Sequence, residues 1–205
     1  ARVREMPDKV AFADERDEVT FRELAQRAQS AGSFIAANAE SRAPIACYME
    51  KSTRAIAAML GAVYAGCCYS VIDVRQPAPR ARAVVDKLEA PLVVADAATI
   101  GAAREIFVAY RVVSIEDIID GEVDSTLLAR RRADAIDIDP LYINFTSGST
   151  GTPKGVAVCH RSVIDFIGSF TSIFGITQDD VLANQAPFDF DVSVKDVYGG
   201  LATGA

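Results

Sequence analysis

The sequence predicts an α/β fold in which a layered, largely parallel sheet has helices on both of its faces. Short apolar runs that suit buried strands alternate along the chain with segments whose apolar residues recur at helical spacing. Glycines and prolines separate several of these segments. Of the 205 residues, 50% are apolar and 24% are charged, which is typical of a globular protein with a core. Strands that alternate with helices need crossover connections, and these favour parallel pairing.

The first long helix is predicted to begin at a capping box. In the run Thr20-Phe21-Arg22-Glu23, the threonine side chain can accept a backbone hydrogen bond while the glutamate reaches back. Apolar residues then recur at helical spacing to about Asn38. A short buried strand is predicted over residues 44–49, and Ser52 is placed to cap a helix that runs to Tyr64.

Residues 55–72 carry no charge, and their number is close to that of a membrane span. Gly61 and Gly66 interrupt this stretch, and its last residues form a β-like run. A buried helix, a glycine with positive φ at position 66 and a buried strand over 68–72 explain the stretch better than a membrane span does. We therefore expect no membrane-spanning segment.

The alternation continues through the middle of the chain. Pro77 and Pro79 mark a turn. The elements predicted after it are a helix over 80–89, a strand over 92–95, a helix over 100–109 and a strand over 112–115. Residues 120–139 form the most polar and charged stretch, which includes the run Arg130-Arg131-Arg132, and we interpret them as a solvated connector.

The charges and the metal-binding residue types argue against several classes of function. The chain has 21 lysines and arginines against 28 aspartates and glutamates, and the resulting charge of −7 does not suit a nucleic-acid-binding protein. His160 is the only histidine, and Cys47, Cys67, Cys68 and Cys159 show no C-x-x-C spacing, so we predict neither a zinc site nor a disulfide scaffold. The opening residues show no basic-then-apolar leader, and we expect a cytoplasmic protein.

A turn rich in glycine and hydroxyl groups follows the strand-like run at 141–145. Its glycines let backbone N–H groups point inward, its hydroxyls add hydrogen-bond donors and its lysine adds positive charge, which together suit phosphate groups. Pro153 and Gly155 break the P-loop pattern around Lys154. A flexible linker is the alternative, but the runs on both sides of the turn suit buried strands. The turn contains Thr146, Ser147, Gly148, Ser149, Thr150, Gly151, Thr152, Pro153, Lys154 and Gly155.

A second candidate site lies close to the end of the sequence. Ser193, with Asp196 three residues later, can cap a helix that continues through Leu201, and Asp191 lies just before it. An aspartate at such a place is most often a cap or a partner of the helix dipole, and a ligand-binding role is the alternative. His160 and the paired cysteines are interpreted as structural.

The turn at 146–156 resembles the glycine-rich signature of the adenylate-forming superfamily, which includes acyl-CoA synthetases, luciferases and the adenylation domains of non-ribosomal peptide synthetases. Three other segments resemble motifs of this family in the family's order. They are residues 19–24, residues 64–73, in which Val71 replaces the usual proline, and residues 190–193, which resemble the amino-acid-binding motif of the peptide-synthetase branch. The resemblance spans nearly the whole chain.

The resemblance implies ATP-dependent activation of an amino acid to an aminoacyl adenylate, followed by transfer to the phosphopantetheine thiol of a carrier protein. It implies that the turn holds the ATP phosphates, with Mg²⁺ sharing their neutralisation, and that Asp191 binds the α-ammonium group of the amino acid. Val192 and Lys195 match positions that line the substrate pocket, and Phe190 would be an aromatic gate at the acyl site, although core packing is an alternative for Phe190. The implied phosphate-binding residues are Thr146, Ser147, Gly148, Ser149, Thr150, Gly151 and Lys154.

The same resemblance implies that residues 1–205 are the N-terminal portion of the large subdomain of an adenylation domain. The second half of the nucleotide site and the C-terminal lid with its catalytic lysine are expected downstream, so no catalytic residue is expected within the chain and the chain alone is predicted to be inactive. A D-alanine carrier protein ligase, an acyl-CoA synthetase and a non-catalytic binding or scaffold module remain alternatives. The identity of the amino acid stays open.

Overall fold

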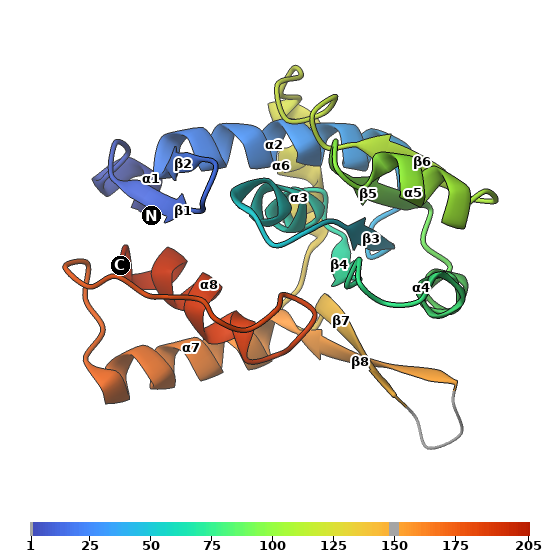
Figure 1. Ribbon diagram of the computed structural model, residues 1–205. Coiled ribbons are helices and arrows are strands. Elements are labelled where there is room, and N and C mark those ends of the chain that lie inside the picture. The colour runs from blue at the N-terminus through green and yellow to red at the C-terminus, as the bar shows by residue number, and fades with distance from the viewer. Residues whose placement is uncertain (1, 148–151) are drawn as a thin grey trace.

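A computed structural model describes residues 2–147 and 152–205 and shows a six-stranded sheet at the centre of the molecule (Figure 1). The strands are β3 (Pro44–Tyr48), β4 (Cys68–Val71), β5 (Leu92–Ala95), β6 (Arg111–Ser114), β7 (Pro140–Ser147) and β8 (Pro153–Cys159). Their order across the sheet is β6-β5-β3-β4-β7-β8, and every neighbouring pair is parallel except β7 and β8. The predicted fold class is confirmed.

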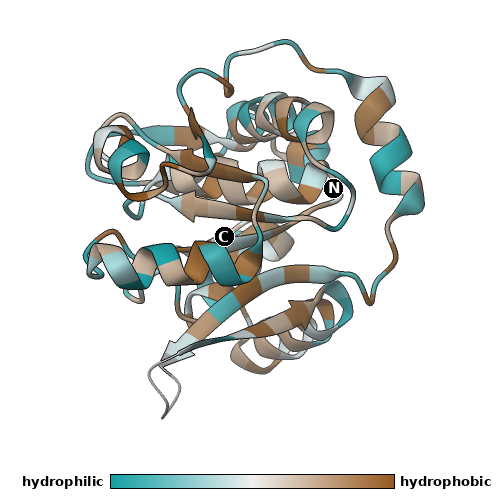
Figure 2. Ribbon diagram, turned by 90° about the vertical axis from the view of Figure 1, so that its right-hand side faces the viewer, coloured by the Kyte–Doolittle hydropathy of each residue, from teal (hydrophilic) through white to brown (hydrophobic). Residues whose placement is uncertain are grey.

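Helices cover both faces of this sheet. Alternate residues of β3 point to opposite faces, so that Ile45 and Cys47 join one hydrophobic cluster while Ala46 and Tyr48 join another. The central strands are correspondingly apolar in Figure 2. The first cluster includes side chains of α2 (Phe21–Asn38), α3 (Thr53–Tyr64), α6 (Ser125–Asp134), α7 (His160–Phe174) and α8 (Ser193–Thr203); the second includes those of α4 (Ala78–Leu88) and α5 (Ile100–Ile106).

The helix starts predicted at Thr20 and Ser52, which depend on neighbouring residues, are confirmed. The Glu23 N–H donates to Thr20 Oγ1 over 3.2 Å and the Thr20 N–H donates to Glu23 Oε2 over 2.9 Å, which completes the capping box of α2. Ser52 Oγ accepts from the Ala55 N–H over 3.1 Å at the start of α3. Gly66 has a φ of 70°, as a glycine after a helix should.

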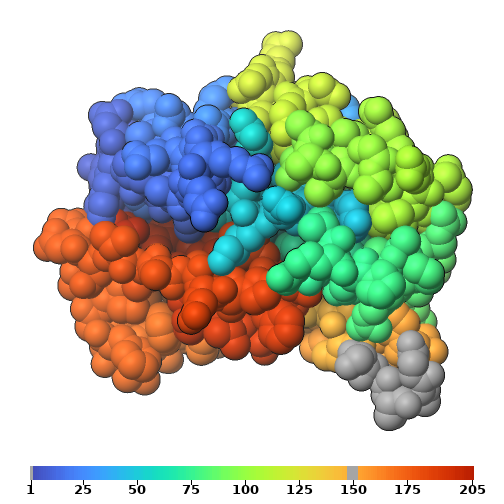
Figure 3. All heavy atoms as spheres, viewed as in Figure 1, coloured from blue at the N-terminus to red at the C-terminus, as the bar shows by residue number. Residues whose placement is uncertain are grey.

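The N-terminal segment adds elements that the sequence analysis did not identify. They are the short helix α1 (Arg2–Glu5) and the antiparallel strands β1 (Val10–Ala13) and β2 (Glu18–Thr20). This segment lies against the C-terminal part of the chain, where Arg2 Nε donates to the Ala202 carbonyl oxygen over 2.8 Å. Figure 3 shows the two ends of the chain side by side on the surface. None of the described helices is long and apolar enough to cross a membrane.

The connector predicted at 120–139 is in fact partly helical. Helix α6 packs against α2 and buries Leu128. The Arg131 guanidinium donates to the carbonyl oxygens of Ala36 and Ala39 over 2.7 Å each and also to Ser41 Oγ. The last carbonyl groups of a helix have no hydrogen-bond partner within the helix. Arg131 therefore supplies hydrogen bonds to carbonyl groups at the C-terminal end of α2. This contact joins residues more than ninety positions apart, which explains why local sequence patterns did not reveal it.

The second strand of the hairpin is less buried than predicted. β8 is the outermost strand of the sheet and pairs with β7 alone among the strands described. Val156 is 51% exposed, and the hairpin projects from the rest of the molecule (Figure 1). An apolar run therefore indicated the strand correctly but not its position at the sheet edge.

Candidate functional site

The β7–β8 hairpin fixes the base of the glycine- and hydroxyl-rich turn. Its antiparallel register places Thr146 opposite Lys154, and both residues are exposed. Gly155 lies opposite Phe145, whose ring would come within 3.2 Å of a Cβ atom at position 155, so glycine allows the ring to lie over the strand. The predicted phosphate-binding residues Gly148, Ser149, Thr150 and Gly151 lie outside the described residues. The side chain of Ser147 is likewise not described.

The segment that carries Asp191 packs near the strand that leads to this turn, since Phe188 and Val194 on either side of Asp191 share one hydrophobic cluster with Tyr142 of β7. Burial raises the pKa of Tyr142 on β7, and the nearby Asp191 carboxylate raises it further. Tyr142 and Thr146 are four residues apart, so they point to the same face of β7 and are separated by about 13 Å along the strand. The segment with the second predicted site therefore lies near the strand that ends in the turn of the first. Tyr142 was not predicted as a site residue, although its even spacing from Thr146 is visible in the sequence.

Two further tyrosines hold this arrangement together. The rings of Tyr69 and Tyr142 stack with their centroids 6.0 Å apart, on residues that are partners in the β4–β7 register. Tyr69 also contacts Tyr198 of α8 through its hydroxyl group. These contacts join β4, β7 and α8, and α8 begins directly after the Asp191 segment.

The Asp191 carboxylate has no counter-ion among residues 2–147 and 152–205, where no basic group lies within 4.0 Å of it. Lys195 Nζ instead lies 2.6 Å from Asp196 Oδ1. The other oxygen of Asp196 accepts from Asn184 Nδ2 over 2.9 Å. Asp191 is exposed, whereas Asp196 is buried. The geometry thus leaves one carboxylate free to pair with a cation from outside the chain.

The predicted cap of α8 is wrong in detail. Val192, rather than Ser193, is the N-cap residue, and its backbone has helical angles with φ −58° and ψ −29°. The Ser193 hydroxyl donates to the Phe190 carbonyl oxygen over 2.7 Å, and the carboxylate of Asp196 pairs with the Lys195 ammonium group. A capping box cannot form because neither side chain is directed to the free backbone N–H groups.

The side chains that flank Asp191 are open to solvent. Phe190 is 58% exposed and Val192 is 51% exposed. Phe190 therefore does not pack in the core of the described part of the chain. Both side chains offer apolar surface next to a free carboxylate, an arrangement that suits a ligand with a charged end and an apolar part.

The remaining candidates are structural. His160 begins α7, where burial lowers the pKa of its imidazole, and its backbone N–H donates to the Asp139 carbonyl oxygen over 3.1 Å. Cys67 and Cys68 are buried free thiols whose pKa is raised by burial to about 11, so they are unreactive near neutral pH. Within the part of the chain that the structure describes, no three His, Cys, Asp or Glu residues gather to hold a metal ion.

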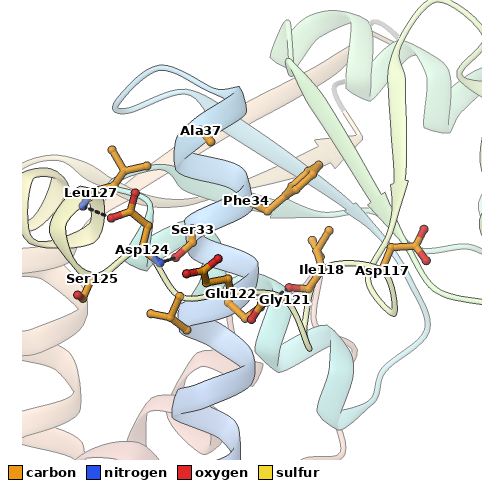
Figure 4. Close-up of a pocket in the computed structure, with 12 residues that line it drawn as sticks. Ser33, Phe34, Ala37, Asp117, Ile118, Gly121, Glu122, Asp124, Ser125 and Leu127 are labelled. Atoms are coloured by element: carbon orange, nitrogen blue, oxygen red, sulfur yellow. Dashed lines mark hydrogen bonds between the residues drawn. The ribbon is translucent and has the colours of Figure 1, made fainter.

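A pocket of about 500 Å³ lies between α2 and the segment that precedes α6 (Figure 4). Several of its polar groups already have hydrogen-bond partners within the chain. Ser33 Oγ accepts from the Asp124 N–H over 2.9 Å, and Asp124 Oδ1 accepts from the Leu127 N–H over 2.9 Å. The Ser30 hydroxyl donates to the Ile118 carbonyl oxygen over 2.7 Å. These bonds explain how the segment is held on α2 and leave few groups for a ligand.

A smaller cavity of about 350 Å³ lies at the carboxyl ends of β3 and β4 and is closed on one side by the segment that leads to Asp191. Asp189 lines it, together with Asp73 and Arg75. Burial raises the pKa of Asp189, and the Asp73 carboxylate raises it further. Asp189 was not predicted as a notable residue, because its environment depends on the β4–α4 connection far away in sequence.

Comparison with known proteins shows what this arrangement resembles. The family model described as "AMP-binding enzyme" matches residues 1–205. The D-alanine–D-alanyl carrier protein ligases of Bacillus anthracis (strain A0248) and Bacillus cereus (strain G9842) are each 31% identical over 202 residues, which cover 98% of this chain and 39% of the relative. The chain thus spans about two fifths of the length of these curated relatives.

Solved structures agree with the family model. The non-ribosomal peptide synthetase FmoA3 is 27% identical with a TM-score of 0.86, over 100% of this chain and 21% of that chain. Its form with bound α-methyl-L-serine-AMP is 26% identical with a TM-score of 0.88, over 100% of this chain and 22% of that chain. The N-terminal subdomain of Klebsiella oxytoca NpsA, at 24% identity and a TM-score of 0.78 over 99% of this chain and 49% of that chain, shows the same fold.

Proposed function

The chain belongs to the AMP-binding enzyme family, and on this basis we propose that it is part of an adenylate-forming ligase that uses ATP to activate an amino acid. One observation carries the choice of an amino acid. Asp191 is an exposed carboxylate without a counter-ion among the described residues, in a segment that packs near the strand leading to the glycine- and hydroxyl-rich turn. An ammonium group is the natural partner of such a carboxylate.

In the proposed reaction, the amino acid carboxylate attacks the α-phosphorus of ATP, an aminoacyl adenylate forms and pyrophosphate leaves. Asp191 pairs with the ammonium group, and Phe190, Val192 and the carbon chain of Lys195 line the same pocket. The turn at the end of β7 holds the phosphates through Thr146, Ser147, residues 148–151 and Lys154. Positioning and charge neutralisation then provide most of the catalysis, as expected for transfer at phosphorus.

Mg²⁺ is proposed to enter together with ATP. The base of the turn offers the Thr146 hydroxyl and the Lys154 ammonium group, and neither is an anionic ligand of the kind that Mg²⁺ prefers. The phosphate oxygens would therefore supply the negative charge that holds the ion, while the turn holds the phosphates. The FmoA3 structure with bound AMPPNP, at 25% identity and a TM-score of 0.82 over 100% of this chain and 21% of that chain, supports ATP as the nucleotide.

Residues 1–205 are proposed to form the N-terminal part of a longer adenylation domain that is inactive without the rest. The match to 39% of the ligase relatives supports this assignment. So does the surface of α7, on which Ile173 is 77% exposed and Phe174 is 70% exposed, since the rest of such a domain could cover it. The complete enzyme is proposed to act in the cytoplasm and to pass the activated amino acid to the phosphopantetheine thiol of a carrier protein.

Amino-acid-dependent ATP–pyrophosphate exchange by the full-length protein tests this proposal. The panel should contain D-alanine, the common L-amino acids, a fatty acid and an aryl acid. We expect exchange with at least one amino acid and none with the fatty acid or the aryl acid. D-alanine is a specific candidate, because the ligase relatives are named for it. Exchange with the fatty acid alone would indicate an acyl-CoA synthetase. Binding of ATP without any exchange would indicate a non-catalytic module.

A second assay determines which of two thiols accepts the activated amino acid. The protein is given its preferred amino acid together with either a phosphopantetheine-bearing carrier protein or free coenzyme A. We expect thioester formation on the carrier protein. Thioester formation on coenzyme A alone would contradict the carrier-protein assignment and leave adenylate formation untouched.

A further inference from the structure

We propose that Asp196 is a positioning residue that holds the Lys195 ammonium group away from Asp191 and so keeps Asp191 available for the substrate. This inference rests on the proposed function, in which Asp191 binds the amino group of an amino acid. It assigns a role to an ion pair in the first turn of α8, next to the proposed pocket.

Lys195 is well placed to block Asp191. The two residues are four positions apart, and Val192 between them already has helical backbone angles. Asp191 lies two residues before α8 begins, and the Val194 N–H donates to the Asp191 carbonyl oxygen over 3.0 Å, so a turn keeps Asp191 close to the first residues of the helix. A lysine side chain has a flexible four-carbon stem that can reach such a partner. Nevertheless, Lys195 Nζ lies 2.6 Å from Asp196 Oδ1.

The surroundings of Asp196 explain this choice of partner. The Asp196 side chain is only 9% exposed, whereas Asp191 is open to solvent, and opposite charges attract more strongly where water is excluded. Asn184 Nδ2 bonds to only one oxygen of Asp196, so the other oxygen would lose its charged partner if Lys195 moved. Lys195 Nζ also lies 6.0 Å from the centroid of the Phe170 ring, which adds a favourable contact on the same side.

The test is made on the full-length protein with its preferred amino acid. In the Asp196→Asn variant, Lys195 loses its charged partner and can turn to Asp191, where it competes with the substrate ammonium group. We expect the KM for the amino acid to rise by about two- to tenfold, the range that a weak to moderate ion pair provides, while the KM for ATP is unchanged. The matched control is Asp137→Asn, which removes the partner of Arg161 at an exposed pair and should change neither constant.

A second change separates competition from structural damage. In the double variant Asp196→Asn/Lys195→Met no cation remains to occupy Asp191, so the amino acid KM should recover most of the rise seen in Asp196→Asn. If Asp196 only supported the fold, the second substitution would leave the KM raised or raise it further. This result would overturn the proposal, as would an unchanged amino acid KM in Asp196→Asn.

The outcomes distinguish this inference from the proposed function. If no amino acid supports exchange by the native protein, the proposed function fails and the inference falls with it. If exchange occurs but Asp196→Asn has native constants, only the inference fails. Should Asp196→Asn not fold, a crystal structure of the native protein with an aminoacyl-adenylate analogue decides the question. Lys195 Nζ bonded to Asp196 supports the inference, and Lys195 Nζ bonded to Asp191 or to the ligand overturns it.

Discussion

The hydroxyl groups of Tyr69 and Tyr198 lie 3.1 Å apart and join the centre of the sheet to α8. Tyr69 is 3% exposed, and burial raises the pKa of both side chains, so both hydroxyl groups stay protonated at neutral pH. Because the Tyr69 ring also stacks on Tyr142, the same side chain contacts β7 and α8. This contact joins the middle of α8 to the strands next to it, including β7, which leads to the glycine- and hydroxyl-rich turn.

Removal of one of these hydroxyl groups should destabilise the protein. The Tyr198→Phe variant leaves the buried Tyr69 hydroxyl without this partner, and we expect the free energy of unfolding to fall by about 1–3 kcal/mol. Urea denaturation followed by circular dichroism measures the change. Tyr64→Phe is the matched control, since Tyr64 is 40% exposed, and a loss as large in this control would remove the special role of the pair.

The run of three arginines in α6 provides an internal comparison. Arg131 donates to two carbonyl oxygens at the end of α2, whereas Arg130 is exposed. We expect Arg131→Ala to lower the free energy of unfolding by about 2 kcal/mol and Arg130→Ala to change it by less than about 0.5 kcal/mol. Equal effects of the two substitutions in chemical denaturation would contradict the role assigned to Arg131.

Asp189 should make stability depend on pH in an unusual direction. Burial, followed by the Asp73 carboxylate, raises its pKa above the usual 3.8, so the folded state favours the protonated form. The resulting stabilisation is complete below pH 3.8 and is lost as the pH rises through the folded-state pKa. Asp189→Asn should therefore be more stable than the native protein at pH 7, and this difference should shrink towards pH 4. A variant less stable than native at pH 7 in thermal denaturation would refute the assignment.

Lys154 should act on ATP and not on the amino acid. It lies opposite Thr146 at the base of the turn, where its charge can reach a phosphate group. We expect Lys154→Ala in the full-length protein to raise the KM for ATP by about 10- to 100-fold and to leave the amino acid KM unchanged. This factor corresponds to the loss of one hydrogen bond to a charged group. Lys87→Ala, at an exposed lysine in the last turn of α4, should leave both constants unchanged. A raised amino acid KM in Lys154→Ala would place this lysine elsewhere in the site.

The features predicted from the sequence are those that depend on residues close together in the chain. The capping box at Thr20, the cap at Ser52 and the positive φ of Gly66 each involve a few neighbouring residues, and the structure confirms all three. Helix α6 was missed because its only buried residue is Leu128 and its main polar contact is to α2. Such contacts between distant segments leave no local pattern.

The candidate site likewise combines local features, which could be predicted from the sequence, with contacts between distant segments, which could not. The residue types of the turn and the presence of Asp191 were visible in the sequence, and the structure adds that the segment with Asp191 packs near Tyr142, on the strand that leads to the turn. The partner of Lys195 could not be predicted, because Asp191 and Asp196 are both within reach of it in sequence. Burial of Asp196 decides between them, and burial depends on how Asn184 and α7 pack against α8.

The central claim is that Asp191 binds the amino group of an amino acid that is activated by ATP. The most direct measurement compares ATP–pyrophosphate exchange by the full-length native protein with exchange by Asp191→Ala, using the amino acid that the native protein prefers. The account predicts exchange that depends on the amino acid in the native protein and is abolished in the variant, while the variant still binds ATP. Exchange at the native rate and with the native KM in Asp191→Ala would contradict it.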